Sequence, residues 1–438
     1  MKKIIVYAVT LVTLSIITIF IFNSKYKIVQ NHNTKLKLPT LIWTKYINVI
    51  FFICICLTSC NTKPDCYVDY DHLKELRRLT CKVENIDLSN SKVLTEQDFM
   101  HNYVTEPNYI RLDNSVPLGQ IEKIRKYKNN FYILSNDKIY IFNGKGKYLK
   151  TIDYKGHGRN EYIVLRDFQI LPKENIILGI DDREKKIFKF SLRTGKCLGT
   201  MDEIVASPFA RKIGKYYIHS LLYGNDANLE DSHLIVVTDG KKTIAKQFSM
   251  PPITENAFVE NNLYEHGHYA TFIPLYSDTV YCINDNLTYY PKYVVKQKKS
   301  IWSKKNESIK YQQVSDMLKT QSYTYLSPGM FMEAKHGIIL GLSIGNNYGL
   351  SNKYYFYDKI KKNIYELETG MFKEKTDQVF PTFLSFTADN SFYGYYQDIS
   401  VYKFLLDSNL LKKGKLYNII KNSKKGDNPV LVEFKLKN

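Results

Sequence analysis

Short alternating runs of hydrophobic and polar residues dominate the chain from Asn108 onward. The first four are NYIRLD (108–113), IEKIRKY (121–127), NFYILSN (130–136) and KIYIFN (138–143). An alternation with a period of two, bounded by Asn, Asp, Gly and Lys, predicts short β-strands with one buried face. Asn143-Gly144 and Gly146 follow the fourth run, and these residue types favour the positive φ angles of a tight hairpin turn.

A strand–turn–strand pattern recurs five times along the chain. It occupies residues 138–152, 186–201, 233–248, 278–295 and 353–367. The gaps between anchors Ile139, Ile187, Ile235, Val280 and Tyr354 are 48, 48, 45 and 74 residues. A period of about 40–50 residues with four strands per unit is typical of a β-propeller.

Two segments interrupt the pattern with helix-like sequence. Residues 297–328 lengthen the last gap and are helix-like from Glu307 to Leu318, and residues 400–423 read as helical. The final unit, residues 382–397 and 428–437, lacks one strand, which residues 108–113 can supply. We therefore predict an all-β fold, a six-bladed propeller with small helical insertions, closed by pairing the two ends of the domain.

Two apolar runs precede this domain. Residues 4–22 follow Lys2-Lys3 and are long enough to span a membrane. Residues 47–57 follow Lys45 and end in Leu57-Thr58-Ser59-Cys60, which resembles a bacterial lipobox. A basic start, an apolar core and a polar flank are typical of a signal peptide, and lipidation of Cys60 would anchor the chain in a membrane.

These two runs leave alternative interpretations open. Residues 4–22 are an inner-membrane helix, or residues 1–35 are an upstream extension and translation starts near residues 36–42. We favour the second, which leaves a conventional lipoprotein signal. The predicted domains are then residues 1–59 with the signal, a tether over 60–105 with one helix-like stretch from Asp71 to Leu79, and the propeller over 106–438.

Charge and composition add little to the functional picture. The net charge is +19. The chain contains 36 Tyr and 23 Phe but only 2 Trp. Residues 1–59 hold seven Lys and no acid, which leaves 55 basic and 43 acidic residues from Cys60 onward. The excess lysines are scattered singly, without the aromatic–basic motif of RNA-binding modules, so we expect no nucleic-acid partner.

The cysteines fit an exported protein. Cys66 and Cys81 could form a disulfide in an oxidising compartment. The sequence has no C-x-x-C spacing, so neither a zinc site of that type nor thioredoxin-like chemistry is indicated.

Three motifs with known catalytic or metal-binding counterparts have simpler interpretations here. GLSIG (341–345) matches the G-x-S-x-G nucleophile elbow, but no His follows it and a strand-like run does, so we expect a propeller strand. His266 and His268 are candidate metal ligands, although a polar loop is the simpler reading. Residues 181–184 (DDRE) are acidic enough to attract calcium but lie where a hairpin turn with a local ion pair is needed.

Four residues are candidates for a ligand-binding rim. His157, Arg159 and Glu161 lie on one loop, GHGRNEY. Asp278 precedes a strand and either bonds the backbone between blades or contacts a ligand.

The sequence resembles the six-bladed β-propeller lipoproteins of Bacteroidetes, distant relatives of NHL-repeat propellers. The resemblance covers about residues 85–438 and rests on four segments: 144–162, 167–198, 272–283 and 427–437. Arg159-Asn160 replaces the Pro-Gly usual in the first of them. The family resemblance implies an architecture and an envelope location more than a particular activity.

We therefore expect a non-enzymatic, monomeric binding propeller that holds a peptide, glycan or envelope protein and is attached to a membrane, with the outer membrane favoured, through lipid at Cys60. No cofactor is required by this reading. The alternative is a propeller hydrolase, lyase or lactonase with a divalent metal in its central channel. It would need three or more Asp, Glu or His side chains that converge on the axis from different blades.

Overall fold

The computed structural model describes residues 72–202, 207–221, 233–250, 261–302, 323–346, 349–369, 378–381, 383–388 and 391–437, with a few short pieces between them. The chain divides into two units, Met1–Pro64 and Asp65–Asn438, and all described residues belong to the second. The expected signal, residues 1–59, and Cys60 lie outside the described residues. Among the helices that are described, none has the length and apolar character that a membrane span requires.

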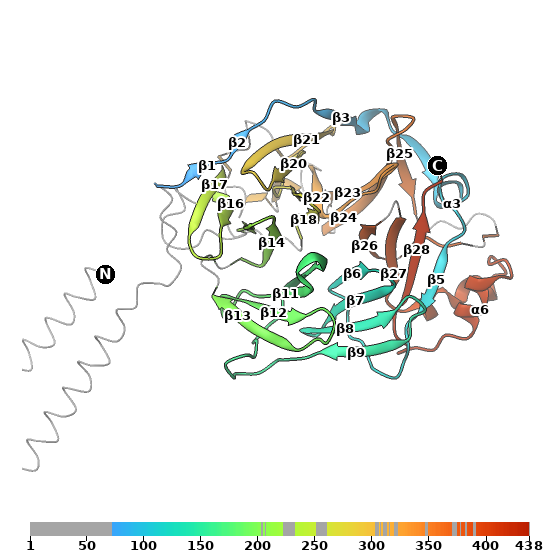
Figure 1. Cartoon of the computed structure of the whole chain (residues 1–438). Coiled ribbons are helices and arrows are strands. Elements are labelled where there is room, and N and C mark those ends of the chain that lie inside the picture. The colour runs from blue at the N-terminus through green and yellow to red at the C-terminus, as the bar shows by residue number, and fades with distance from the viewer. Residues whose placement is uncertain are drawn as a thin grey trace, which may run out of the picture. The chain divides into compact units, whose positions relative to one another are not determined.

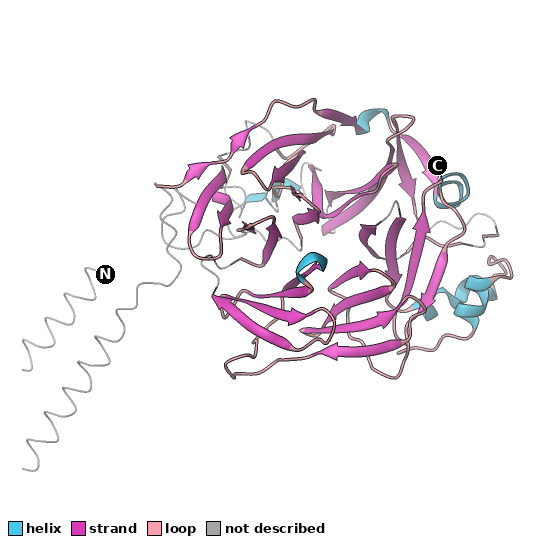
Figure 2. Ribbon diagram, in the orientation of Figure 1, coloured by secondary structure: helices cyan, strands magenta, loops and turns pink. Residues whose placement is uncertain are grey.

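The described strands form six antiparallel blades arranged in a ring (Figure 1, Figure 2). Blade 1 contains β6 (Lys123–Tyr127), β7 (Asn130–Ser135), β8 (Lys138–Asn143) and β9 (Tyr148–Ile152). Blade 2 contains β10 (Asp167–Leu171), β11 (Ile176–Asp181), β12 (Lys186–Ser191) and β13 (Cys197–Asp202). Blade 3 contains β14 (Phe209–Ile213), β15 (Tyr216–Ser220), β16 (His233–Thr238) and β17 (Thr243–Ser249).

The remaining blades complete the ring. Blade 4 contains β18 (Leu263–His266), β19 (Tyr269–Phe272), β20 (Thr279–Asn284) and β21 (Thr288–Lys296). Blade 5 contains β22 (Thr324–Glu333), β23 (Gly337–Asn346), β24 (Gly349–Asp358) and β25 (Asn363–Glu368). Blade 6 contains β26 (Phe383–Ala388), β27 (Ser391–Tyr396), β28 (Val430–Lys435) and β5 (Asn108–Arg111). The predicted six-bladed propeller is thus confirmed, and the recurring hairpins are the third and fourth strands of blades 1 to 5.

Ring closure follows the predicted route. β5, from the beginning of the domain, pairs antiparallel with β28 from its end, with Ile110 opposite Leu431 and Tyr109 opposite Val432. These side chains are nearly inaccessible to solvent. The pairing removes an open sheet edge and ties the two ends of the domain together.

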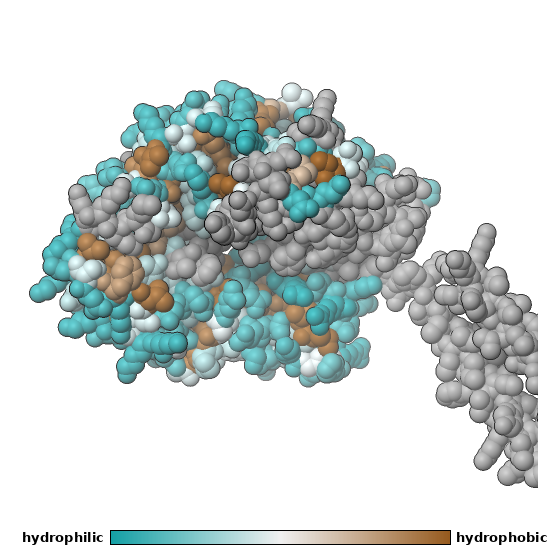
Figure 3. All heavy atoms as spheres, turned by 180° about the vertical axis from the view of Figure 1, so that it is seen from behind, coloured by the Kyte–Doolittle hydropathy of each residue, from teal (hydrophilic) through white to brown (hydrophobic). Residues whose placement is uncertain are grey.

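The first strand of each blade lies innermost, and hydrophobic side chains fill the space between neighbouring blades. Between blades 1 and 2, for example, Leu134 and Ile141 share a buried cluster with Phe168 and Phe188. GLSIG forms part of β23 in blade 5, as expected for a strand rather than a nucleophile elbow. Figure 3 shows that exposed hydrophobic residues on one side of the molecule occur as small groups between hydrophilic ones.

Residues 74–95, which we call the strap, run along the outside of three blades (Figure 1). Its strands pair parallel with outer strands: β1 (Lys74–Glu75) with β17, β2 (Arg77–Arg78) and β3 (Glu84–Asp87) with β21, and β4 (Lys92–Thr95) with β25. The helix expected from Asp71 to Leu79 is therefore wrong, because the open edges of β17 and β21 offer its backbone hydrogen bonds that an isolated short helix cannot match.

Helices occupy few positions. α3 (Glu96–Tyr103) begins after the strap, and the side chain of Thr95 accepts a hydrogen bond from the backbone of Asp98 at its N-terminus. The helical segment predicted at 400–423 is confirmed in part: a 3₁₀ turn (Ile399–Lys403) leads into α5 (Phe404–Asp407), and α6 (Lys415–Lys421) follows after residues 408–414, which are not helical. Further 3₁₀ turns lie at Leu88–Asn90 and Pro172–Glu174. Of the insertion at 297–328, residues 313–314 and 316–318 are helical.

Antiparallel connectivity gives the ring two faces. Connections between blades, and between the second and third strands of a blade, lie on one side, which we call the connection face. Turns between the first and second strands, and between the third and fourth, lie on the other, which we call the hairpin face. The helical segment at 400–423 joins the second and third strands of blade 6 and therefore belongs to the connection face.

Candidate functional site

Five charged side chains from the innermost strands of four consecutive blades gather at the axis of the ring. We call them the axial cluster: Lys123 and Arg125 from β6, Asp167 from β10, Arg211 from β14 and Glu265 from β18. Blades 1 and 4 stand opposite each other in a ring of six, yet Nε of Arg125 lies 3.2 Å from Oε1 of Glu265. The cluster therefore spans the axis.

Asp167 is the centre of one half of the axial cluster. Its Oδ2 atom lies 2.6 Å from Nη1 of Arg211 and 3.0 Å from Nζ of Lys123. Its Oδ1 atom accepts a hydrogen bond from the backbone N–H of Phe168 at 2.8 Å. Because Asp167 is fully buried, these contacts replace the hydration that its carboxylate loses.

Arg211 joins the two halves. Its Nε atom lies 2.6 Å from Oε2 of Glu265, and Nη1 also donates to the carbonyl of Ala210 at 2.8 Å. The Arg211 side chain is fully buried, whereas that of Glu265 is 24% exposed and that of Arg125 is 14% exposed. Solvent therefore reaches the cluster from the side of Glu265 and Arg125.

Aromatic rings flank two of the cations. The ammonium of Lys123 lies 4.3 Å from the centre of the Phe209 ring, and the guanidinium of Arg125 lies 5.9 Å from that of Phe168. Such contacts stabilise a cation that has lost part of its hydration.

Proton affinities in the axial cluster follow from burial and charge. Burial lowers the pKa of Lys123 from 10.5 to about 8; repulsion by Arg211 and Arg125 acts in the same direction, and attraction to Asp167 opposes it. Burial alone would raise the pKa of Asp167, but attraction by Arg211, Lys123 and Arg125 outweighs it and lowers that pKa to about 2. At neutral pH the cluster thus carries three positive and two negative charges.

Donor groups in the cluster exceed the acceptors. Nη2 of Arg211 is buried and has no hydrogen-bond acceptor in the described part of the chain. Nζ of Lys123 is close to Asp167 but lacks hydrogen-bond geometry. Buried donors and a buried excess positive charge are both costly, so the arrangement favours binding of an anion, which would supply acceptors and neutralise the charge.

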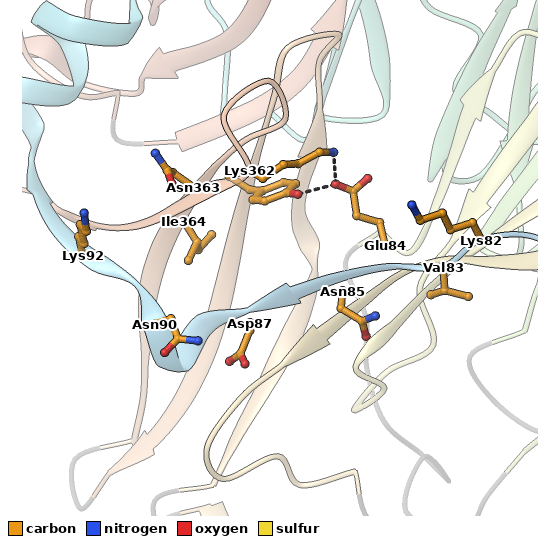
Figure 4. A pocket seen from close by; sticks show the side chains of 11 residues that line it. Lys82, Val83, Glu84, Asn85, Asp87, Asn90, Lys92, Lys362, Asn363 and Ile364 are labelled. Carbon is orange, nitrogen blue, oxygen red and sulfur yellow. Dashed lines mark hydrogen bonds and ion pairs between the residues drawn. The ribbon is translucent and has the colours of Figure 1, made fainter.

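A second candidate lies on the outside of the ring, where the strap crosses blade 5 (Figure 4). There a pocket of about 670 Å³ is lined by residues of mostly polar type: Lys82, Val83, Glu84, Asn85, Asp87, Asn90, Lys92, Tyr357, Lys362, Asn363 and Ile364. Glu84 accepts hydrogen bonds from Lys362 at 2.5 Å and from the Tyr357 hydroxyl. The charge of Glu84 is therefore used to hold the strap on blade 5, and the axial cluster is the stronger candidate.

The predicted rim loop lies on the connection face between blades 1 and 2. His157, Arg159 and Glu161 are all exposed. The Glu161 carboxylate folds back and accepts a hydrogen bond from the backbone N–H of Gly158 at 2.8 Å. A Cβ atom at Gly156 would lie only 2.0 Å from Glu161 Oε2. Glu161 thus shapes the loop, and a ligand role for the other two stays a prediction.

The other predicted site residues are in blade 4. Asp278 lies on the connection face and accepts a hydrogen bond from the Thr279 hydroxyl at 2.9 Å. His266 and His268 lie at the turn between β18 and β19 on the hairpin face, where His266 stacks on Tyr269 and His268 lies 3.6 Å from Asp285. The structure therefore does not bring these histidines together with the rim loop.

The predicted acidic turn has the expected structural role. Oδ1 of Asp181 accepts hydrogen bonds from the backbone of Arg183 and Glu184, and Oδ2 accepts one from Ile163 at 2.7 Å. Asp182 forms an ion pair with Arg166 at 3.3 Å. This turn therefore fastens the rim loop to blade 2.

Metal and disulfide predictions remain open. Within the described ranges, no group of three or more His, Cys, Asp or Glu side chains is placed to hold a metal ion. Cys81 is exposed, whereas its predicted disulfide partner Cys66 lies outside the described residues, as does Cys60, the predicted lipidation site.

None of the axial cluster was identified from the sequence. The available signal was the presence of charged residues in the first strand of four successive units, as in KIRKY (123–127) and FARKI (209–213). Their convergence could not be read from the chain, because it depends on the curvature of the whole ring.

Among the similar solved structures, the first described below supports the fold. A protein described as exported, from Bacteroides fragilis, is 17% identical, with a TM-score of 0.66, over 82% of this chain and 100% of that one. A DUF4221 family member from Bacteroides vulgatus is 11% identical, with a TM-score of 0.46, over 76% of this chain and 98% of that one. Virginiamycin B lyase from Staphylococcus aureus is 8% identical, with a TM-score of 0.37, over 76% and 99%.

The comparison with sequences defines the family. No curated protein matches the chain. The family model described as a domain of unknown function, DUF4934, matches residues 83–435, which include most of the strap and nearly all of the ring. The expected resemblance to a six-bladed propeller family found in Bacteroides is thereby supported. The chain belongs to the DUF4934 family.

Proposed function

We propose that this protein is a non-enzymatic binding propeller whose axial cluster holds an anionic group of its ligand. The single observation that carries the proposal is the excess of buried cations at the axis: among the described residues, Lys123, Arg125 and Arg211 are paired with two carboxylates, those of Asp167 and Glu265. A net buried charge is unfavourable unless a partner of opposite sign neutralises it.

Carboxylate, phosphate and sulfate groups fit this chemistry. Each offers oxygen acceptors in the geometry that a guanidinium or ammonium group prefers. The C-terminus of a peptide and the acidic sugar of a glycan both carry such a group, which agrees with the ligand classes expected from the sequence. The ligand would enter from the side on which Glu265 and Arg125 are partly exposed.

The metal-dependent alternative has weaker support from the same residues. It requires three or more Asp, Glu or His side chains at the axis, and the axial cluster supplies two carboxylates. Both are already paired with cations, Asp167 with Arg211 and Glu265 with both arginines. This donor set favours anion binding over coordination of a divalent cation.

We place the protein in the bacterial envelope, anchored through lipid on Cys60, with the outer membrane favoured. The lipobox-like Leu57-Thr58-Ser59-Cys60, the preceding apolar run and the description of the B. fragilis propeller as exported support this location. We further propose a monomer whose partner is a peptide, glycan or envelope protein. Mass spectrometry of the mature N-terminus tests the anchor: a diacylated Cys60 supports it, and peptides from residues 25–45 contradict it.

Anion binding is tested by calorimetric titration of the purified protein with citrate, sulfate, phosphate and a peptide with a free C-terminal carboxylate. Two variants change the axial charge in opposite directions. Glu265→Gln raises the net charge of the cluster and should tighten binding, whereas Lys123→Met removes the excess charge and should weaken it at least tenfold. Lys353→Met is a matched control, because Lys353 pairs with Glu366 on the surface of blade 5.

The expected result is saturable binding of at least one anion that follows this charge order. Binding that is equal in all four proteins would place the anion elsewhere. Absence of binding by every anion, with all proteins folded by circular dichroism, would contradict the proposal.

A further inference from the structure

A lysine-rich segment projects from blade 6 on the connection face. Residues 398–427, which we call the basic excursion, connect β27 to β28 and contain α5 and α6. In Figure 1 they form the projection that carries the α6 label. A connection between neighbouring strands of a sheet needs only two to five residues, so its length serves something other than blade formation.

The basic excursion carries a net positive charge. It holds seven lysines and three aspartates, a net charge of +4: Lys403, Lys412, Lys413, Lys415, Lys421, Lys424 and Lys425 against Asp398, Asp407 and Asp427. All seven lysines are exposed. Among the described residues, none of them forms an ion pair with an acidic side chain.

Local contacts already occupy two of the three aspartates. Asp398 accepts hydrogen bonds from the backbone and the hydroxyl of Ser400, and Asp427 lies 3.4 Å from Arg111. Asp407 alone is exposed without such a contact among those described. Of the three aspartates, Asp427 is thus paired with a cation outside the excursion, and the exposed surface of the excursion keeps an excess of positive charge.

Two hydrophobic side chains are exposed beside these lysines. Val401 is 61% exposed and Phe404 is 50% exposed, and both lie in the first helical part of the excursion. Exposed large apolar residues next to a basic surface are typical of segments that lie in a membrane interface.

The remainder of the excursion is fixed firmly to the ring. Leu405, Leu416 and Ile420 are almost completely buried and pack in the hydrophobic cluster that includes Phe434 of β28. The exposed lysines, Val401 and Phe404 are therefore held on a packed support, so that binding would not require the segment to fold first.

We propose that the basic excursion docks on an anionic phospholipid surface, with Val401 and Phe404 entering the interface and the lysines contacting headgroup phosphates. Clusters of four to eight lysines are attracted to anionic membranes. The two apolar side chains favour a membrane over nucleic acid, for which charge alone would suffice. The inference rests on neither the axial cluster nor anion binding there.

This contact would fix the orientation of the propeller. A contact at blade 6 would turn the connection face of the ring toward the membrane.

The test measures the tryptophan fluorescence of the full chain that carries Phe404→Trp. The spectrum of the protein without that change is subtracted, because it contains the emission of Trp43 and Trp302. Both proteins are placed with phosphatidylcholine vesicles, with or without phosphatidylglycerol, and brominated acyl chains serve as quenchers. Because the apolar N-terminal runs would hold the chain on either vesicle, only the residue-404 signal reports on the excursion. We expect a blue shift and quenching with the anionic vesicles alone.

Two further variants separate the basic excursion from general charge. Adding Lys412→Glu, Lys413→Glu and Lys424→Glu to the reporter should abolish the response. Adding Lys196→Glu, Lys241→Glu and Lys242→Glu makes the same charge change on exposed lysines of the hairpin face and should preserve it. The proposal is overturned by an unquenched reporter, by equal quenching in both vesicles, or by a blue shift of equal size with a double-stranded oligonucleotide.

Discussion

The Nη1 atom of Arg211 lies 2.6 Å from Oδ2 of Asp167, and neither side chain is exposed to solvent. The pair joins the innermost strands of blades 2 and 3 at the axis of the ring. A buried ion pair of this kind contributes little net stability compared with apolar residues of the same size, but removing one partner leaves the other charge uncompensated. The pair therefore makes the axis sensitive to single substitutions.

Arg211→Met should destabilise the protein by about 3–5 kcal/mol. The substitution removes the closest cation of the buried Asp167 carboxylate and leaves it with Lys123 at 3.0 Å and Arg125 at 3.9 Å. The free energy of unfolding from urea titrations measures the effect. Lys353→Met is the control, because its pair with Glu366 is partly exposed and should contribute less than about 1 kcal/mol. Equal effects of the two substitutions would show that the axial pair has no special role.

Stability should rise with pH in the alkaline range because of Lys123. Its pKa is about 8 in the folded protein against an ordinary 10.5, so between these values the unfolded state binds more protons. Unfolding free energy then increases with pH across this window. Comparison of the wild type with Lys123→Met isolates the effect, since the variant lacks the group. Identical pH dependence of the two proteins from pH 8 to 10 would contradict a buried, easily deprotonated Lys123.

Gly146→Ala should weaken ring closure. Gly146 has φ of +80°, and a Cβ there would lie 2.0 Å from the carbonyl oxygen of Arg111 in β5. We expect the free energy of unfolding to fall by about 3 kcal/mol or more, because the backbone must shift to make room for the Cβ atom. Gly426→Ala is matched in φ at +90° but meets no atom within 4 Å, so its cost should be about 1 kcal/mol. Thermal unfolding of the two variants measures these losses of stability. Similar losses in Gly146→Ala and Gly426→Ala would argue against tight packing of β5 on blade 1.

The strap should contribute to stability as part of the fold. Ile86 in β3 is 1% exposed and packs between blades 4 and 5, whereas Val93 in β4 is 69% exposed. Ile86→Ala should cost about 2–4 kcal/mol in unfolding free energy, and Val93→Ala less than about 0.5 kcal/mol. Urea titration measures both. If Ile86→Ala is as mild as Val93→Ala, the strap behaves as a loosely attached tether.

The ring itself was predictable from the sequence because its signals are local and repeated. Alternation predicts the strands, and the spacing of Ile139, Ile187 and Ile235 predicts the blades. The prediction that residues 108–113 close the ring followed from the observation that the last repeat unit lacks one strand. Each inference used residues that are close in sequence or related by the repeat.

The strap and the axial cluster were not predictable for a common reason. In DHLKELRRL (71–79) helix formers are frequent, but pairing with distant strand edges determines the conformation of Lys74–Glu75 and Arg77–Arg78. Arg125 and Glu265 are 140 positions apart and meet only because blades 1 and 4 face each other. Such contacts depend on tertiary geometry and leave no periodic signal.

The most direct test of anion binding at the axis is anomalous diffraction from crystals of the protein soaked in selenate under chloride-free conditions. Selenate is an oxyanion whose selenium can be located independently of any assumption about the ligand. We expect an anomalous peak at the axis, with a selenate oxygen within about 3 Å of Nη2 of Arg211. A map that shows selenate elsewhere on the ring but none beside Lys123, Arg125 and Arg211 would contradict it.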